Sequence, residues 1–154
     1  MTGMMGEGWY FEDYEVGREI KSSSRTVTEA DIVNFAGITG DWNPIHTDEE
    51  FAKKSVFGRR VAHGTLTFAI MTGLFARLGI IERTIVAFYG VDRLRFVKPV
   101  FIGDTLTAVA RIVDKEDRGN AGMIVMEASV VNQRGEVVLT GTVRFLVKKR
   151  GEVG

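Results

Sequence analysis

The sequence of 154 residues contains no cysteine and only two prolines. Without cysteine the chain has no disulfide bond, no thiolate nucleophile and no cysteine ligand for a metal ion. This composition suits a reducing compartment, and we expect a cytoplasmic protein. With 45% apolar and 26% charged residues, the chain is typical of a folded globular protein rather than a disordered one. We therefore expect a single domain spanning residues 1–154.

An excess of charge of either sign is also missing. Twenty basic and twenty acidic residues give a formal net charge of zero, and no basic block is present. Nucleic-acid binders carry clustered Lys and Arg, so the sequence argues against a nucleic-acid partner. A neutral chain is weakly protected against self-association, which favours an oligomer.

Long apolar runs are absent too. The most apolar stretch, "GTLTFAIMTGLFARLGII", is interrupted by Arg77 and falls short of the ~20 residues of a membrane span. The first 17 residues lack a basic region followed by an apolar run, so we expect neither a secretory signal nor a membrane partner.

Two short helices are expected around the segment "GITGDWNPIHTDEEFA". The first begins at Thr28, whose side chain can cap the helix together with Asp31, and ends at Gly40. The second begins at Thr47, where "TDEE" has the pattern of a capping box. Pro44 excludes a helix through the stretch between them, so we expect a stiff loop.

A third helix is expected over residues 64–79. Its apolar residues cover nearly the whole circumference, which predicts burial on all sides. Gly73 in its interior has a propensity cost of roughly 1 kcal/mol, so we expect a close packing contact there.

Five strands are indicated by β-branched residues and by a period of two in the second half of the chain. "DRGN" and "NQRG" are typical hairpin turns. One antiparallel sheet and one buried helix fit together if the sheet curls around the helix, which places the chain in the α+β class. The expected strands are 18–27, 85–97, 105–117, 122–131 and 136–149.

Three blocks in this order resemble the MaoC-like (R)-specific enoyl-CoA hydratases: "TGDWNPIHTDEEFA", "RVAHGTL" and "RFVKPVFIGDTL". The first contains the signature G-D-x-N-P-x-H of that family, and the likeness runs from about Thr28 to Val147. The resemblance implies the hot-dog fold, with about five strands wrapped around one central helix. It implies Asp41 and His46 as the catalytic pair and Gly64 as the backbone donor to the thioester carbonyl. It also implies a homodimer or a dimer of dimers.

The chemistry can be argued from the residue types as well. Hydration of an enoyl thioester needs a base for water, a proton for C2 and a donor for the enolate-like oxygen. His46 suits the first task because an imidazole ordinarily titrates near 6.5, roughly neutral pH. Asp41 can hold the water or orient the imidazole, and Asn43 can fix the loop or the imidazole. Gly64 opens a helix whose first amides lack partners and favour negative charge.

Other interpretations of single residues remain open. Asp41 alone is typical of a turn, and His46 alone is typical of a residue beside a helix cap. A metal site needs a third or fourth ligand, which the sequence does not offer near them, so we expect no metal. His63 is expected to pack or to cap a helix rather than to act as a second base. Trp42 is expected to pack over the loop or to line the acyl pocket.

Basic residues are candidates for contacts with the coenzyme A phosphates, since Arg and Lys suit phosphate. We expect Asn43, Arg95 and Lys98 to contribute to substrate binding, and Arg93, Arg59 and Arg60 are further candidates for the phosphates. The aromatic residues of the lead 1–17 are expected to cover a sheet edge or the pocket.

The sequence therefore predicts reversible hydration of trans-2-enoyl-CoA to (R)-3-hydroxyacyl-CoA. No cofactor is expected, because coenzyme A belongs to the acyl-CoA substrate. Three alternatives stay open: dehydration of a 3-hydroxyacyl group on acyl carrier protein, thioester hydrolysis, and binding of acyl-CoA without catalysis. The fold alone does not choose among them.

Overall fold

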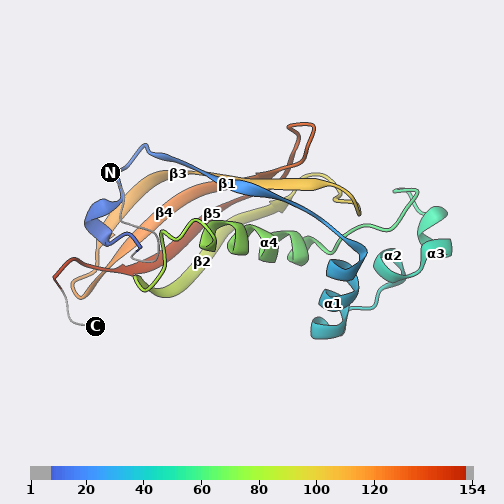
Figure 1. The fold of residues 1–154 in the computed structure, drawn as a ribbon, viewed down its shortest axis with the longest axis horizontal. Coiled ribbons are helices and arrows are strands. Elements are labelled where there is room, and N and C mark those ends of the chain that lie inside the picture. Colours follow the sequence, from blue (N-terminus) through green and yellow to red (C-terminus); the bar gives the residue numbers. More distant parts are fainter. Residues whose placement is uncertain (1–7, 152–154) are drawn as a thin grey trace.

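The computed structural model describes residues 8–151. Five strands form one antiparallel sheet, one helix lies along the sheet, and three shorter helices project beyond its end (Figure 1). The elements in chain order are η1 (Phe11–Asp13), β1 (Glu19–Thr26), α1 (Glu29–Thr39), α2 (Pro44–Thr47), α3 (Glu49–Lys53), α4 (Gly64–Ala76), β2 (Ile85–Phe96), β3 (Thr105–Asp117), β4 (Ala121–Val131) and β5 (Val137–Lys148).

The strand order is β1-β3-β4-β5-β2, with every neighbouring pair antiparallel. The five predicted strands are confirmed, and so are both hairpin turns, which join β3 to β4 and β4 to β5. Irregular register interrupts the β2–β5 pairing at three places, and such irregularities bend a strand and increase its twist. The resulting sheet is long and curved, and α4 lies against its concave face (Figure 1).

Helix α4 supplies the middle of the core. Leu66, Ile70, Met71 and Leu74 are almost fully buried against the sheet. The prediction of burial on all sides is wrong, however, because the opposite face is open and carries only small residues: Thr65, Ala69, Gly73 and Ala76. The predicted close contact at Gly73 is also wrong, since a Cβ built there meets no described atom within 4 Å.

Strand β2 forms one edge of the sheet and exposes large apolar side chains to solvent: Val86, Phe88, Tyr89 and Phe96. A 12-residue edge strand with such side chains offers unpaired backbone groups beside an apolar surface. The edge is therefore suited to pairing with another strand.

Part of the N-terminal lead closes the core at one end. Trp9 and Tyr14 are buried in the main core cluster, and Phe11 packs so closely on Gly122 of β4 that a Cβ at this glycine would overlap the ring. These aromatic residues therefore close the core at the end of the sheet away from α1–α3 (Figure 1) and, contrary to the expectation, cover neither an edge strand nor the pocket. The lead's first seven residues lie outside the described part of the chain. Within residues 8–151, no helix has the length and apolar character needed to span a bilayer.

Candidate active site

The loop between α1 and α2 is built from local hydrogen bonds. Helix α1 ends at Gly40, which has the left-handed conformation expected of a C-cap (φ 79°). The Asp41 carboxylate then accepts the Asn43 amide at 3.2 Å, and the Asn43 side chain accepts the Ile45 amide at 3.1 Å. Asn43 is therefore the N-cap of α2, and the predicted loop-fixing role is confirmed.

Two predictions about this loop are wrong. Pro44 does not exclude a helix but begins one, since the first helical position needs no N–H donor. The next helix is capped by Asp48, which accepts the Phe51 amide at 3.0 Å, and not by Thr47. The Thr47 hydroxyl instead bonds backward to the loop carbonyl groups of Trp42 and Asn43. The motif is thus a compact pair of helical turns.

The His46 ring is oriented by a backbone group. Its Nδ1 lies 2.7 Å from the Val61 carbonyl oxygen. A carbonyl oxygen only accepts, so Nδ1 carries the proton and Nε2 is left as the basic nitrogen. The structure assigns no Asp41–His46 hydrogen bond within residues 8–151, so the imidazole is oriented by Val61 rather than by Asp41.

The segment Val61–Gly64 connects this loop to the body of the protein. The Val61 amide donates to the Ile45 carbonyl at 3.2 Å, and the Ala62 amide donates to the Val100 carbonyl at 2.8 Å. Val61 also forms an isolated β-bridge with Phe101. Both Val61 and Ala62 are buried. The segment thus gives His46 a rigid acceptor.

His63 is packed, as expected, although it does not cap the helix, and it brings a third titratable group next to Asp41 and His46, which was not predicted from the sequence. It is 2% exposed, its ring stacks on His46 with centroids 3.8 Å apart, and its Nε2 lies 3.0 Å from the Asp41 carbonyl oxygen. The only feature of the sequence that could have indicated this placement is the position of His63 directly before Gly64. A carboxylate oxygen of Asp41 and one nitrogen from each histidine lie within 4.8 Å of one another.

The prediction that no third potential metal ligand lies nearby is therefore wrong. The arrangement nevertheless fits a metal ion poorly. Ring nitrogen lone pairs lie in the ring plane, and these rings are stacked at 25°, so their lone pairs run side by side rather than converge at about 2.0–2.1 Å on one ion. One nitrogen of each ring is also engaged by a carbonyl oxygen.

Gly64 is the first residue of α4. The preceding N-cap, His63, makes no side-chain hydrogen bond to the helix, and within residues 8–151 the Gly64 amide has no acceptor. The absence of a side chain matters, because a Cβ here would lie 2.8 Å from the Phe96 ring. Such a free amide at the start of a helix suits an oxygen that carries negative charge.

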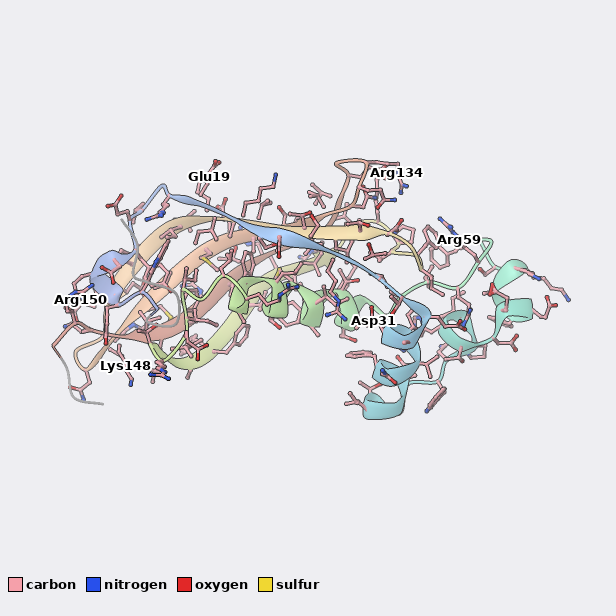
Figure 2. All side chains as sticks on the ribbon, viewed as in Figure 1. Glu19, Asp31, Arg59, Arg134, Lys148 and Arg150 are labelled. Carbon is pink, nitrogen blue, oxygen red and sulfur yellow. The ribbon has the colours of Figure 1, made fainter. Side chains whose placement is uncertain are left out.

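A pocket of about 320 Å³ opens beside Gly64. Its walls are mostly apolar and include Phe57, Ala62, Phe96 and Val138. This volume is near the lower end, roughly 300 Å³, of the usual range for small-molecule sites. A larger hollow of about 670 Å³ lies elsewhere on the sheet; Glu19 at its rim projects from the face away from α4 (Figure 2). Neither Asp41 nor His46 lines either hollow, but Val61, whose carbonyl oxygen holds His46, lines the one beside Gly64.

Lys98 lines the pocket beside Gly64, whereas Arg95 does not. The Lys98 ammonium group donates to Glu136 at 2.8 Å. This hydrogen bond, with others from Asn132 and Arg134, lowers the pKa of Glu136 to about 2. The Arg95 guanidinium donates to its neighbour's carbonyl, Leu94. The predicted substrate contacts of both residues stay predictions.

The other basic candidates differ in whether their side chains are free to contact a phosphate group. Arg60 is held between Glu29 and Glu49, with contacts of 2.9 and 3.0 Å and a side chain only 13% exposed. It therefore clamps α1 to α3. Arg59 lies over the Phe101 ring and is exposed near the α1–α3 end of the molecule (Figure 2). Trp42 is 52% exposed, with its ring edge near Gly37.

Comparisons with known proteins identify the family of this chain. The family model described as "MaoC like domain" matches residues 12–134. The chain is 34% identical over 148 residues to the (R)-specific enoyl-CoA hydratase of Rhodospirillum rubrum, covering 92% of this chain and 94% of the relative. It is 35% identical over 143 residues to the 3-hydroxybutyryl-CoA dehydratase of Methylorubrum extorquens, covering 93% and 87%.

A third relative is much longer. Protein MaoC of Klebsiella aerogenes is 44% identical over 97 residues, which cover 63% of this chain but only 28% of that protein. Among solved structures, the MaoC-like dehydratase from Rhodospirillum rubrum superposes with a TM-score of 0.83 at 32% identity, covering 93% of this chain and 99% of the other. A Mycobacterium tuberculosis protein with a double hot-dog fold superposes with a TM-score of 0.82 at 17% identity, covering 96% of this chain and 46% of the other. The predicted hot-dog fold is confirmed.

The contribution of Asn43, the N-cap of α2, to stability can be tested by substitution. Replacing Asn43 with Ala removes the acceptor for the Ile45 amide, and we expect the free energy of unfolding to fall by about 1 kcal/mol. Asn43→Asp keeps an oxygen at this place and should remain close to wild type. Urea denaturation of the three proteins measures the difference. Equal stability of Asn43→Ala and wild type would contradict the capping role.

Proposed function

The chain belongs to the MaoC-like dehydratase family, and from this premise we propose that it is a cytoplasmic hydro-lyase acting on acyl-CoA thioesters. It adds water reversibly to trans-2-enoyl-CoA and yields (R)-3-hydroxyacyl-CoA. The observation that carries the proposal is the clustering of the Asp41 carboxylate, His46 and His63 within 4.8 Å of one another. Val61, whose carbonyl oxygen holds His46, and Gly64, which follows His63, both line the apolar pocket, and within residues 8–151 the Gly64 amide has no acceptor.

His46 and Asp41 share the attacking water. A water molecule whose two hydrogen bonds are about 2.8 Å long joins acceptors roughly 4.5 Å apart, and such a water is compatible with an Asp41 carboxylate oxygen and a His46 ring nitrogen that lie within 4.8 Å of each other. His46 Nε2 takes one proton while the water oxygen bonds to C3 of the substrate. The pair then returns a proton to C2, so one water supplies both groups added across the double bond.

Gly64 acts at the other end of the reacting system. As the C3–O bond forms, negative charge moves to the thioester carbonyl oxygen. The Gly64 amide donates to this oxygen, and the dipole of α4 favours charge at the same place. The acyl chain lies in the apolar pocket, whose small volume favours short chains. No metal or redox cofactor takes part in this scheme.

The alternative functions differ in the product that each would form. A protein that only binds acyl-CoA needs no basic nitrogen directed by a carbonyl oxygen, whereas His46 has one. Hydrolysis would place the water on the thioester carbon rather than on C3. Dehydration on acyl carrier protein uses the same groups and differs only in the carrier at the pocket entrance.

The first test follows the loss of enoyl-thioester ultraviolet absorbance with crotonyl-CoA. Wild type should remove the signal, and His46→Ala and Asp41→Asn should each lower kcat by roughly 10²–10⁴-fold, the usual contribution of a positioned acid or base. Asp41→Asn is nearly isosteric, so its fold should be unchanged by circular dichroism. Near-normal turnover by either variant would refute its role, and release of free thiol would identify a thioesterase.

The role of Gly64 has a separate test. Gly64→Val should lower kcat by roughly 10²–10³-fold, because a side chain denies the substrate oxygen access to the amide. Stability should change less, since the Phe96 ring that the new side chain meets is 51% exposed and free to turn outward. The double variant Gly64→Val/Phe96→Ala removes the steric conflict. It should recover the melting temperature but not the turnover; recovery of both would refute the oxyanion role.

We also propose that the protein assembles as a homodimer, or as a dimer of dimers, through the exposed edge of β2. Two β2 edges can pair across a two-fold axis and remove both open edges at once. The small residues on the open face of α4 allow a second helix to approach closely. Phe68 of α4 and Phe88 of β2 already contact each other between these two elements, with centroids 6.2 Å apart.

Charge at this surface should disrupt the assembly. Phe88 is 49% exposed in the single chain, so Phe88→Lys should disturb the fold little but bury a charge in the dimer. Sedimentation velocity should show a dimer for wild type and a shift toward monomer for the variant. Val16→Lys is a matched control, because Val16 is exposed outside β2 and α4. A monomeric wild type would contradict the proposal.

A further inference from the structure

His63 is the second of the two histidines in the chain, and no step of the proposed reaction uses it. It occupies the N-cap position of α4, yet its side chain makes no capping hydrogen bond. It is 2% exposed. Helix capping therefore does not explain why an imidazole is buried here, and its contacts with the catalytic loop need another account.

The hydrogen bonding of His63 defines its protonated nitrogen. Nε2 lies 3.0 Å from the Asp41 backbone oxygen, which accepts and never donates, so Nε2 carries the proton. Nδ1 is buried and has no partner in the described part of the chain. A proton on Nδ1 would be a buried donor without an acceptor, which is costly. The Nε2–H form therefore satisfies the site best.

The ring of His63 contacts two other rings. On one side the His46 ring stacks on it, with centroids 3.8 Å apart and planes at 25°. Phe35 of α1 meets it edge-on, with centroids 5.0 Å apart and planes at 63°. His63 is thereby fixed between α1 and the catalytic loop, and it forms a flat support for the imidazole of His46.

These contacts link residues that are far apart in sequence. The hydrogen bond to Asp41 spans 22 residues, while the other bonds around Asp41 are local and involve Thr39, the last residue of α1, and Asn43 in the loop. Asp41 is exposed, so local bonds alone leave the loop free to shift as a unit. His63 connects it to the buried start of α4, next to Gly64.

We infer that His63 is a positioning residue whose Nε2–H fixes the backbone of Asp41 and whose ring supports His46, so that one buried side chain aligns both members of the pair with Gly64. The inference rests on the proposed function. His63 touches neither water nor substrate in this scheme. It affects the rate through geometry, where a misplacement of ~1 Å can cost roughly 10²-fold.

Two substitutions separate the contacts of His63. His63→Phe keeps an aromatic ring for stacking but loses the donor to Asp41. His63→Gln loses the ring but keeps an amide N–H that can reach about the same place. With crotonyl-CoA, we expect His63→Phe to lower kcat by roughly 10–100-fold with KM within about threefold of wild type. His63→Gln should recover part of the lost kcat.

Phe35→Leu is the matched control, because it alters packing on the far side of His63 without touching the hydrogen bond to Asp41. It should lower the melting temperature while kcat stays near wild type. If His63 serves packing alone, the two His63 variants will behave like this control, with lower stability and normal kcat. This result would overturn the inference.

A second measurement does not depend on activity. Long-range ¹H–¹⁵N correlation spectra report which ring nitrogen of a histidine is protonated, and His46→Ala leaves His63 as the only histidine to assign. We expect the Nε2–H form. A proton on Nδ1 of His63 would overturn the inference. A wild type that hydrates no enoyl thioester would refute the proposed reaction instead, and the spectra would then decide whether His63 holds Asp41.

Discussion

Four consecutive residues, Val61–Gly64, connect the groups of the candidate site: two of them hold His46 and Asp41 by hydrogen bonds, and the last is Gly64 itself. The Val61 carbonyl sets the protonated nitrogen of His46, His63 binds the backbone of Asp41, and Gly64 presents its amide. The segment is itself bonded to Val100, just ahead of β3. The geometry of the catalytic pair therefore depends on the sheet, although none of its side chains comes from a strand.

The attachment to the Val61–Gly64 segment helps to keep the exposed loop ordered. Asp41 and Asn43 are exposed, and an exposed loop must lose conformational entropy to stay ordered. Pro44 reduces the conformations available to the unfolded chain. Three hydrogen bonds to the Val61–Gly64 segment, made by Asp41, Ile45 and His46, each add about 0.5–1.5 kcal/mol. On the other side Arg60 joins α1 to α3 with a largely buried guanidinium group, so the loop is held from both directions.

The sequence was sufficient for the sheet and the central helix, because periodicity is a local property; motif spacing singled out Asp41, His46 and Gly64, whose catalytic roles stay predictions. It failed where several local signals compete. Thr47 and Asp48 both resemble N-caps, and the outcome depends on the carbonyl groups that Thr47 meets in the folded loop. Val61 was not predictable, because it acts through a carbonyl group that every residue has. The partner of His63 is 22 residues away, which no local pattern records.

The prediction that α4 is buried on all sides is wrong for the single chain, and the proposed homodimer accounts for this difference. Its sequence is apolar nearly all round, yet one face of small residues stays open in the single chain, next to the open edge of β2. In the proposed homodimer both surfaces become internal, and the pattern of the helix then matches its surroundings. Phe96 ends β2 and covers Gly64, so the edge that we propose to pair with a second copy also bounds the pocket. In the proposed homodimer, association and the shape of the candidate site are therefore coupled through one strand.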